Sequence, residues 1–158
     1  MKIRIGFGFD VHQLQTGIPF FLGGIKINYT KGAKGHSDAD VIIHAICDAL
    51  LGAANLGDIG KHFPDTSKKF KGIDSKILLK EVMALLKKNK YKVGNVDVTL
   101  VLEKPKIKDY ISEMQKVLAG VMQISTEDIS IKATTNEKMG FVGREEGVAA
   151  YAVALISK

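Results

Sequence analysis

The segment SDADVIIHAICDALLGAA, residues 37–54, decides how this chain folds. After its first residue, its only polar or ionisable side chains are Asp38, Asp40, His44, Cys47 and Asp48, and the rest is Val, Ile, Leu, Ala and Gly. That composition is too apolar for a helix with one face in water. With Ser37 as the N-cap and acidic residues in the first turn, we predict a buried helix over residues 37–54.

The flanking segments are predicted from hydrophobic periodicity and turn residues. Residues 3–11 alternate weakly and are predicted as a strand that forms a hairpin with a second strand within residues 20–27. Further expected elements are helices at 74–89 and 108–122 and strands at 96–102, 129–135 and 147–156. The order ββααβαββ indicates an α+β fold in one domain, residues 1–158, with the helices packed on one face of a mixed four-stranded sheet.

The last predicted strand, GVAAYAVALI at residues 147–156, hardly alternates, which is typical of burial on both faces. One face can pack against the helices and the other against a neighbouring subunit, so we favour an oligomer. A central strand in a monomer would produce the same pattern.

Composition limits the functional classes. The chain has 158 residues, 46% hydrophobic and 25% charged, with no Trp and one Cys, as expected for one globular domain. No apolar run reaches the ~18 residues of a membrane span, the N-terminus lacks a signal-peptide pattern, and a lone Cys indicates a reducing cytoplasm or a plastid-like compartment. The net charge of +6 fits either nucleic-acid binding or attraction of an anionic small molecule, and the scattered basic residues favour neither.

Two groups of acidic and histidine residues indicate a metal site. Asp10 and His12 are two apart in a predicted strand and therefore point to the same face. On the predicted helix, Asp40, His44 and Asp48 are four apart and form one polar stripe. Two His and one carboxylate make a three-ligand site with an open position, typical of a catalytic rather than a structural metal. The competing interpretation is a core histidine bonded to Asp40; carboxylates are costly to bury without a purpose, which weighs against it.

Three further segments combine polar side chains, glycines and turn residues. Lys132–Glu137, followed by Gly140–Gly147, carries hydroxyls, glycines and an Arg that can bind phosphate. Glu103–Lys108 places a Pro and three Lys directly after a strand, and residues 55–72 form a loop long enough to be functional. Each also has a simpler interpretation, namely a polar hairpin loop, a solvated basic turn and structured turns.

Together these segments resemble the 2-C-methyl-D-erythritol 2,4-cyclodiphosphate synthases of non-mevalonate isoprenoid biosynthesis, over residues 3–156. The resemblance rests on GFDVH (8–12), HSDADV (36–41) with His44, DALLGAA (48–54), GDIG (57–60), FPD (63–65), GNVD (94–97) and KATTNEK (132–138). It implies a homotrimer, with active sites between subunits, that converts 4-diphosphocytidyl-2-C-methyl-D-erythritol 2-phosphate to the cyclic diphosphate and CMP. The substrate's own 2-phosphate would attack the β-phosphorus, leaving the protein to position the groups and stabilise charge.

The resemblance also implies ligands and contacts. Zinc, or another divalent cation, would be held by Asp10, His12 and His44, and magnesium or manganese would accompany the substrate diphosphate near Glu137. His36 and Thr135 would stabilise the transition state. With Asp10, His12, His36 and Thr135, the implied substrate-binding residues are Ser37, Asp58, Ile59, Gly60, Phe63, Pro64, Asp65, Thr66, Ser67, Leu102, Glu103, Lys104, Pro105, Lys106, Ile107, Lys108, Thr134, Asn136, Glu137, Phe141 and Arg144. Those at 58–67 would hold the methylerythritol portion, and those at 102–108 and 134–137 of the adjacent subunit would form the cytidine diphosphate pocket.

Two other interpretations remain. A different metalloenzyme, such as a phosphoester hydrolase or a non-haem iron oxygenase, would use the same two His and one carboxylate, but it leaves residues 132–138 unexplained. A basic nucleic-acid-binding module explains the charge but not the buried stripe of Asp and His. We therefore expect a small-molecule enzyme with neither a nucleic-acid nor a membrane partner.

Overall fold

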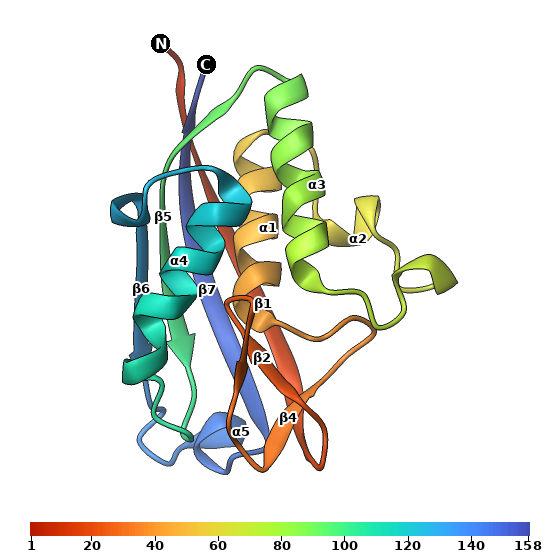
Figure 1. Cartoon of the computed structure of the whole chain (residues 1–158), viewed down its shortest axis with the longest axis vertical. Helices are drawn as coiled ribbons and strands as arrows, with labels where there is room; N and C mark the ends of the chain where they lie inside the picture. Colours follow the sequence, from red (N-terminus) through yellow and green to blue (C-terminus); the bar gives the residue numbers. More distant parts are fainter.

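The computed structural model describes all 158 residues, and its central feature is a five-stranded sheet with the strand order β4–β1–β7–β5–β6 (Figure 1). The strands are β1 (Ile3–Thr16), β4 (Lys31–Lys34), β5 (Lys92–Val101), β6 (Ile129–Thr134) and β7 (Gly147–Ser157). β5 and β6 are parallel and the other neighbours antiparallel, so the sheet is mixed, as predicted. The predicted count of four strands is wrong because β4, only four residues long and without apolar periodicity, adds to the edge of β1.

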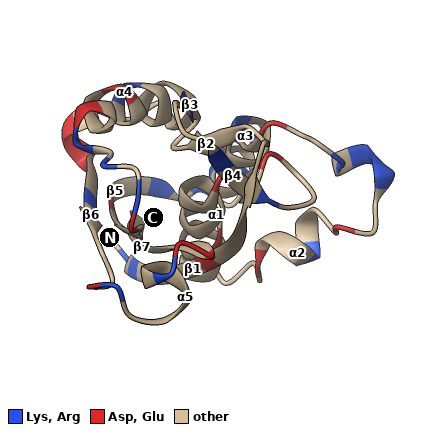
Figure 2. Ribbon diagram, turned by 90° about the horizontal axis from the view of Figure 1, so that it is seen from below, with Lys and Arg blue, Asp and Glu red and all other residues tan.

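Helices cover one face of this sheet (Figures 1 and 2). The longer ones are α1 (Val41–Ala53), α3 (Ser75–Lys88) and α4 (Ile111–Met122); the short ones are α2 (Ile59–His62) and α5 (Gly140–Gly143), with 3-10 turns at Lys68–Phe70, Lys108–Tyr110 and Thr126–Asp128. α1 packs against β1, β7 and α3, and most of its side chains are fully buried, which confirms the prediction of a buried helix. None of the helices is long and apolar enough to cross a membrane.

α1 begins later than predicted. Its N-cap is Asp40, whose carboxylate accepts a hydrogen bond from the Ile43 N–H at 3.1 Å. The same carboxylate accepts from the N–H groups of Gly23 and Gly24 at 2.9 and 2.7 Å. Because these two donors come from a neighbouring hairpin, the buried cap depends on tertiary contacts, and the predicted cap Ser37 lies in the turn ahead of the helix.

That hairpin consists of β2 (Phe20–Leu22) and β3 (Ile25–Ile27), which pair with each other in a separate two-stranded sheet. Gly23 and Gly24 join them with φ values of 59° and 82°, and two positive φ angles are the signature of a type I′ turn. The prediction that residues 20–27 pair with the first strand is therefore wrong, because β1 pairs with β4 and β7 instead.

The other predicted elements are confirmed with shifted ends. β5 begins at Lys92, ahead of the predicted start at residue 96, and the helix predicted over 108–122 opens with a 3-10 turn before α4. The predicted loop of residues 55–72 contains α2 and a further 3-10 turn.

Two glycines let α1 lie directly against β1. A Cβ added at Gly8 would lie 1.9 Å from the carbonyl oxygen of Ala45, and one at Gly6 would lie 1.9 Å from that of Ala49. Only residues without a side chain fit at these two positions. The close approach brings the first turn of α1 next to the middle of β1, where the predicted metal ligands are.

The outer face of β1 and β7 is apolar and exposed. The Phe7 and Tyr151 side chains are 63% and 41% exposed, and Tyr151 stacks against Phe9 with ring centroids 5.0 Å apart. β7 is buried over its first four residues and then alternates, with Tyr151 and Val153 open to solvent. Within a single chain, therefore, β7 is not buried on both faces as its sequence predicts.

Candidate metal centre and active site

Three side chains from two elements converge at one point. Asp10 and His12 project from the inner face of β1, and His44 projects from the first turn of α1. The Asp10 Oδ2 atom lies 2.8 Å from His12 Nε2 and 3.0 Å from His44 Nδ1, and the two nitrogens are 3.2 Å apart. The prediction that Asp10 and His12 share a face is confirmed.

This cluster fits a divalent metal ion. Ligand atoms of a tetrahedral zinc site are about 3.3 Å apart when each lies ~2.0–2.1 Å from the ion, and the three donors here are 2.8, 3.0 and 3.2 Å apart. The side chains of Asp10, His12 and His44 are 24%, 16% and 12% exposed, so the cluster remains open on one side. Two imidazoles and one carboxylate with an open position form the donor set of a catalytic zinc site.

The electrostatics keep the carboxylate ionised. Burial acts to raise the pKa of Asp10, but hydrogen bonds from His12 and His44 and their charges outweigh it and lower that pKa to about 2. Burial acts in the opposite sense on His44, where the hydrogen bond and charge of Asp10 prevail and raise the pKa of the imidazole. Negative charge is therefore available to a cation at neutral pH.

The three residues of the predicted polar stripe on α1 have different contacts. Asp40 caps the helix, and Asp48 accepts a hydrogen bond from the Ile59 N–H at 2.7 Å, which anchors the start of α2. His44 alone of the three joins the cluster. The interpretation of His44 as a core residue bonded to Asp40 is wrong, because its Nδ1 faces Asp10.

A hollow opens beside the cluster, between α1, the segment that follows it and α3. It is lined by His12, His36, Ser37, His44, Ile59, Gly60, Phe63, Pro64, Asp65, Thr66, Phe70, Ile73 and Leu78. His36 Nε2 donates to the Ser67 carbonyl at 3.1 Å, and the His36 carbonyl accepts from the Gly72 N–H at 2.7 Å. Asp58 caps α2 by accepting from the Lys61 N–H at 2.9 Å. The structure thus gathers most residues of the predicted methylerythritol site around the metal cluster.

A second hollow lies at the carboxyl ends of the parallel strands β5 and β6. It is lined by Leu102, Glu103, Pro105, Lys106, Ile107, Lys108, Ile111, Ala133, Thr134 and Thr135. The Leu102 N–H donates to the Thr134 carbonyl at 3.0 Å, so both predicted segments leave the sheet side by side. Beyond its rim, the Asn136 N–H donates to Glu103 at 3.2 Å and the Thr135 hydroxyl donates to Glu137 at 3.3 Å. The residues predicted to hold cytidine diphosphate therefore meet in one place.

The two hollows are separate within one chain. The sheet order places β7 and β5 between β1 and β6, and neighbouring strands are about 4.8 Å apart. His36 and Thr135 consequently line different hollows. Neither hollow is lined by Phe141, which lies in α5, or by Arg144, which directly follows α5. The Arg144 guanidinium pairs with Glu146 at 3.0 Å.

Charge is distributed unevenly around these hollows. In Figure 2 the ribbon of the outermost turn between α2 and α3 is coloured as basic. The 3-10 turn of this segment, Lys68–Phe70, contains Lys68 and Lys69. Lys106 and Lys108 lie at the second hollow, and Lys104, two residues before Lys106, pairs with Glu145 at 3.3 Å. Basic residues therefore stand near both hollows, as an anionic ligand requires.

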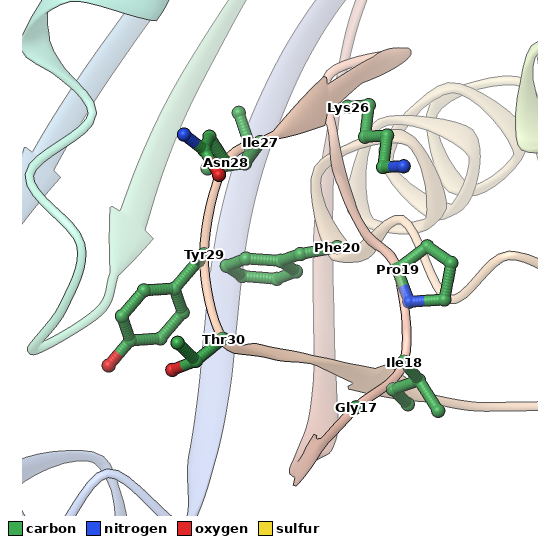
Figure 3. Close-up of a pocket in the computed structure, with 9 residues that line it drawn as sticks. All are labelled: Gly17, Ile18, Pro19, Phe20, Lys26, Ile27, Asn28, Tyr29 and Thr30. Atoms are coloured by element: carbon green, nitrogen blue, oxygen red, sulfur yellow. The ribbon is translucent and has the colours of Figure 1, made fainter.

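A third hollow, framed by residues 17–20 and 26–30, contains none of the predicted site residues (Figure 3). Lys26 is its one charged side chain. The Tyr29 ring points away from the hollow and its hydroxyl donates to Glu145 at 2.9 Å. No cluster of acids, bases or metal ligands lines this hollow.

One functional contact could not be predicted from the motifs. The Ser75 hydroxyl, at the start of α3, lies 2.9 Å from His44 Nε2, on the side of the ring away from the cluster. Phe70, Ile73 and Leu78 also line the first hollow. In the sequence Ser75 indicates only a helix start, because its partner is far away in the chain.

Comparisons with known proteins agree with this geometry. The YgbB family model matches residues 3–157. The 2-C-methyl-D-erythritol 2,4-cyclodiphosphate synthases of Phocaeicola vulgatus and Cytophaga hutchinsonii are 65% and 62% identical to the chain over 158 residues, which cover 100% of this chain and 99% of each relative. A solved structure of 2C-methyl-D-erythritol-2,4-cyclodiphosphate synthase in a form with CDP bound superposes with a TM-score of 0.90 at 36% identity, covering 98% of this chain and 100% of that one.

Proposed function

This chain belongs to the YgbB family, and we propose from that membership and from its site that it converts 4-diphosphocytidyl-2-C-methyl-D-erythritol 2-phosphate to 2-C-methyl-D-erythritol 2,4-cyclodiphosphate and CMP. Such an enzyme is a phosphorus–oxygen lyase of non-mevalonate isoprenoid biosynthesis. The observation that carries the proposal is the cluster of Asp10, His12 and His44. It lies in a chain that is 62–65% identical to these synthases over its whole length.

The reaction needs no nucleophile from the protein. An oxygen of the substrate's 2-phosphate forms a bond to the β-phosphorus, and the bond from that phosphorus to the oxygen of the α-phosphate breaks, so that CMP leaves with the oxygen. No water is consumed. Catalysis then depends on holding the two phosphates in line and on stabilising the charge that develops on the phosphoryl oxygens.

We infer that Asp10, His12 and His44 hold one zinc or other divalent cation. A cation there would act as a Lewis acid and neutralise charge on the β-phosphate. A magnesium or manganese ion would accompany the diphosphate, with Glu137, at the rim of the second hollow, as the carboxylate available to it.

His36 and Thr135 are the residues proposed to act on the transition state. The His36 ring is held by its hydrogen bond to the Ser67 carbonyl, which couples its position to the loop around the first hollow. The Thr135 hydroxyl accepts from the Glu137 N–H and donates to the Glu137 carboxylate, both at 3.3 Å. Donors aimed at the phosphoryl oxygens are worth more in the pentavalent transition state, where those oxygens carry more charge.

We propose that the active form is a homotrimer with β1 and β7 facing the three-fold axis. Two observations support it: the apolar outer face of these strands, with Phe7, Phe9 and Tyr151 exposed, and the separation of His36 from Thr135 within one chain. A neighbouring subunit that covers the apolar face would also bring its nucleotide hollow to the metal cluster. Light scattering should give the mass of three chains; a monomeric mass for active protein contradicts this assembly.

Phosphorus NMR tests the activity directly. The purified protein would be incubated with the cytidine diphosphate substrate, zinc and magnesium, and a parallel sample would contain a chelator in excess. We expect resonances of CMP and a cyclic diphosphate, and neither in the chelated sample. CMP with a linear product would identify a hydrolase instead, and no turnover by metal-loaded trimer would limit the resemblance to the fold.

A further inference from the structure

A buried chain of hydrogen bonds leads away from the metal cluster. Ser75 has no exposed surface, and its hydroxyl lies 2.9 Å from His44 Nε2, the ring nitrogen that does not face the cluster. The same hydroxyl makes a short hydrogen bond to the Asp38 carboxylate, which also accepts from the Ser75 N–H at 3.0 Å and from the Asp40 N–H at 3.2 Å. Asp38 therefore contacts His44 only through Ser75.

The direction of each hydrogen bond follows from the available protons. The Asp38 carboxylate accepts from two backbone N–H groups and from the Ser75 hydroxyl, so the single hydroxyl proton of Ser75 goes to Asp38. At its contact with His44, the Ser75 oxygen can then only accept, and the proton between them must belong to Nε2. The Ser37 hydroxyl, 3.0 Å from the same nitrogen, accepts from the Ala39 N–H and offers Nε2–H a second acceptor.

A neutral imidazole carries one proton, so an Nε2–H group leaves the lone pair on Nδ1. That nitrogen is the one 3.0 Å from Asp10 and 3.2 Å from His12. We propose that Asp38 and Ser75 form a positioning relay, which holds the proton of His44 on Nε2 and thereby keeps Nδ1 aimed at the cluster as a metal ligand. This inference rests on the metal site proposed above. Neither Asp38 nor Ser75 contacts the cluster itself, so both are positioning residues.

The relay makes Asp38→Asn a more informative variant than a truncation. The new amide has nearly the shape of the carboxylate. With its nitrogen in place of the oxygen that Ser75 Oγ contacts, it can donate a proton to Ser75, and the hydrogen bond from the Asp40 N–H to that oxygen is lost. The Ser75 hydroxyl would then be free to donate to Nε2, which favours the opposite tautomer, with the proton on Nδ1. Ser75→Ala removes the acceptor without reversing the preference. Loss of a partner that orients a metal-ligating His weakens metal affinity by about 10- to 100-fold, and we expect Asp38→Asn to lose at least as much as Ser75→Ala.

The matched control is Asp74→Asn. Asp74 caps the same end of α3, accepting from the Lys76 N–H at 2.8 Å and pairing with the Lys76 ammonium at 2.9 Å, but it does not contact His44. It therefore reports any effect of simply loosening the start of α3.

Two measurements test the relay. Zinc affinity is measured by competition with a chromophoric chelator, and the Nε2 proton of His44 is followed by nitrogen-15 NMR of the zinc-loaded protein, where its exchange with solvent reports whether Ser75 accepts it. We expect a slowly exchanging Nε2–H in the wild type and Asp74→Asn, faster exchange in Asp38→Asn and Ser75→Ala, and zinc affinity lowered about 10- to 100-fold in these last two variants only.

The relay is overturned if Asp38→Asn keeps both the slowly exchanging Nε2–H and wild-type zinc affinity, or if Asp74→Asn weakens zinc binding as much as Asp38→Asn does. A wild-type protein that binds no zinc contradicts the metal site and the relay that rests on it. Zinc-loaded protein with an intact relay but no turnover contradicts only the proposed reaction.

Discussion

Replacing Gly8 by Ala should separate the two elements that carry the metal ligands. Gly8 lies on the inner face of β1, two residues before Asp10, and the helix that carries His44 packs directly on it. The added methyl group would lie 1.9 Å from the Ala45 carbonyl oxygen and 2.7 Å from the Ala49 backbone nitrogen. Both neighbours are helix backbone, so no side-chain rotation can relieve the contact.

The size of the effect follows from these distances. Cβ atoms hardly ever approach other atoms more closely than 3.0 Å, so α1 must move away from β1 by about 1 Å. Overpacking of this kind costs about 1–3 kcal/mol of stability. Metal-ligand distances tolerate changes of about 0.2 Å, so the same movement takes His44 out of reach of an ion held by Asp10 and His12, and a 1 Å misplacement lowers turnover about 100-fold.

Urea denaturation and zinc titration of Gly8→Ala measure the two effects. The control is Gly52→Ala in the same helix, where an added Cβ meets nothing within 4 Å; it should be unchanged in zinc affinity and more stable by about 0.5–1 kcal/mol. Gly6→Ala, one helical turn further from His44, should lose stability with a smaller effect on zinc. Wild-type stability and zinc affinity in Gly8→Ala would refute the argument that close packing of α1 on β1 builds the site.

Other positions of the site lead to predictions of the same kind. His44→Ala should lose bound zinc by metal analysis yet keep its assembled mass, whereas His62→Ala, which removes a ring bonded to the Leu56 carbonyl, should keep its zinc; full zinc occupancy in His44→Ala contradicts the ligand assignment. Thr135→Ala should lower kcat on the order of 100-fold with little change in KM, and an effect on KM alone argues against a transition-state role. Burial acts to raise the pKa of Asp10, but the two histidines lower it from 3.8 to about 2. Ionised Asp10 therefore adds about 2 kcal/mol to the free energy of unfolding of metal-free protein above pH 3.8, and this contribution is lost as the pH falls towards 2. Urea denaturation between pH 5 and pH 2 should show this loss in the wild type and not in Asp10→Asn; equal loss in both means that Asp10 is not its source.

The parts of the site that could be predicted from the sequence are those governed by local periodicity. Asp10 and His12 share a face because side chains alternate along a strand, and α1 is buried because residues 41–53 carry almost no polar side chains. For these two features the short-range pattern was sufficient. Residues 102–108 and 134–137 meet because β5 and β6 form a parallel pair, which no local pattern shows, and their meeting was implied only by the family resemblance.

The missed features depend on partners that are remote in the chain. Ser37, Asp38 and Asp40 are all suitable N-caps by residue type, and Asp40 is selected by donors from the hairpin at residues 23–24. The contact of Ser75 with His44 spans 31 residues. The Gly23–Gly24 turn is a different case, because two glycines between short apolar runs are a hairpin signal that could have separated β2 from β3.

β1 connects the metal site to the proposed assembly. Its even-numbered residues from Gly6 to His12 face α1 and supply two close-packing glycines and two metal ligands, while its odd-numbered residues from Ile5 to Val11 form the apolar outer face. A shift of the β1–β7 register by one residue would exchange these two sets, placing aromatic rings against α1 and the ligands on the outer face. The eleven residue pairs from Ile3–Ser157 to Gln13–Gly147 oppose such a shift. One strand register therefore determines both where the metal ligands lie and which surface is available to a second copy of the chain.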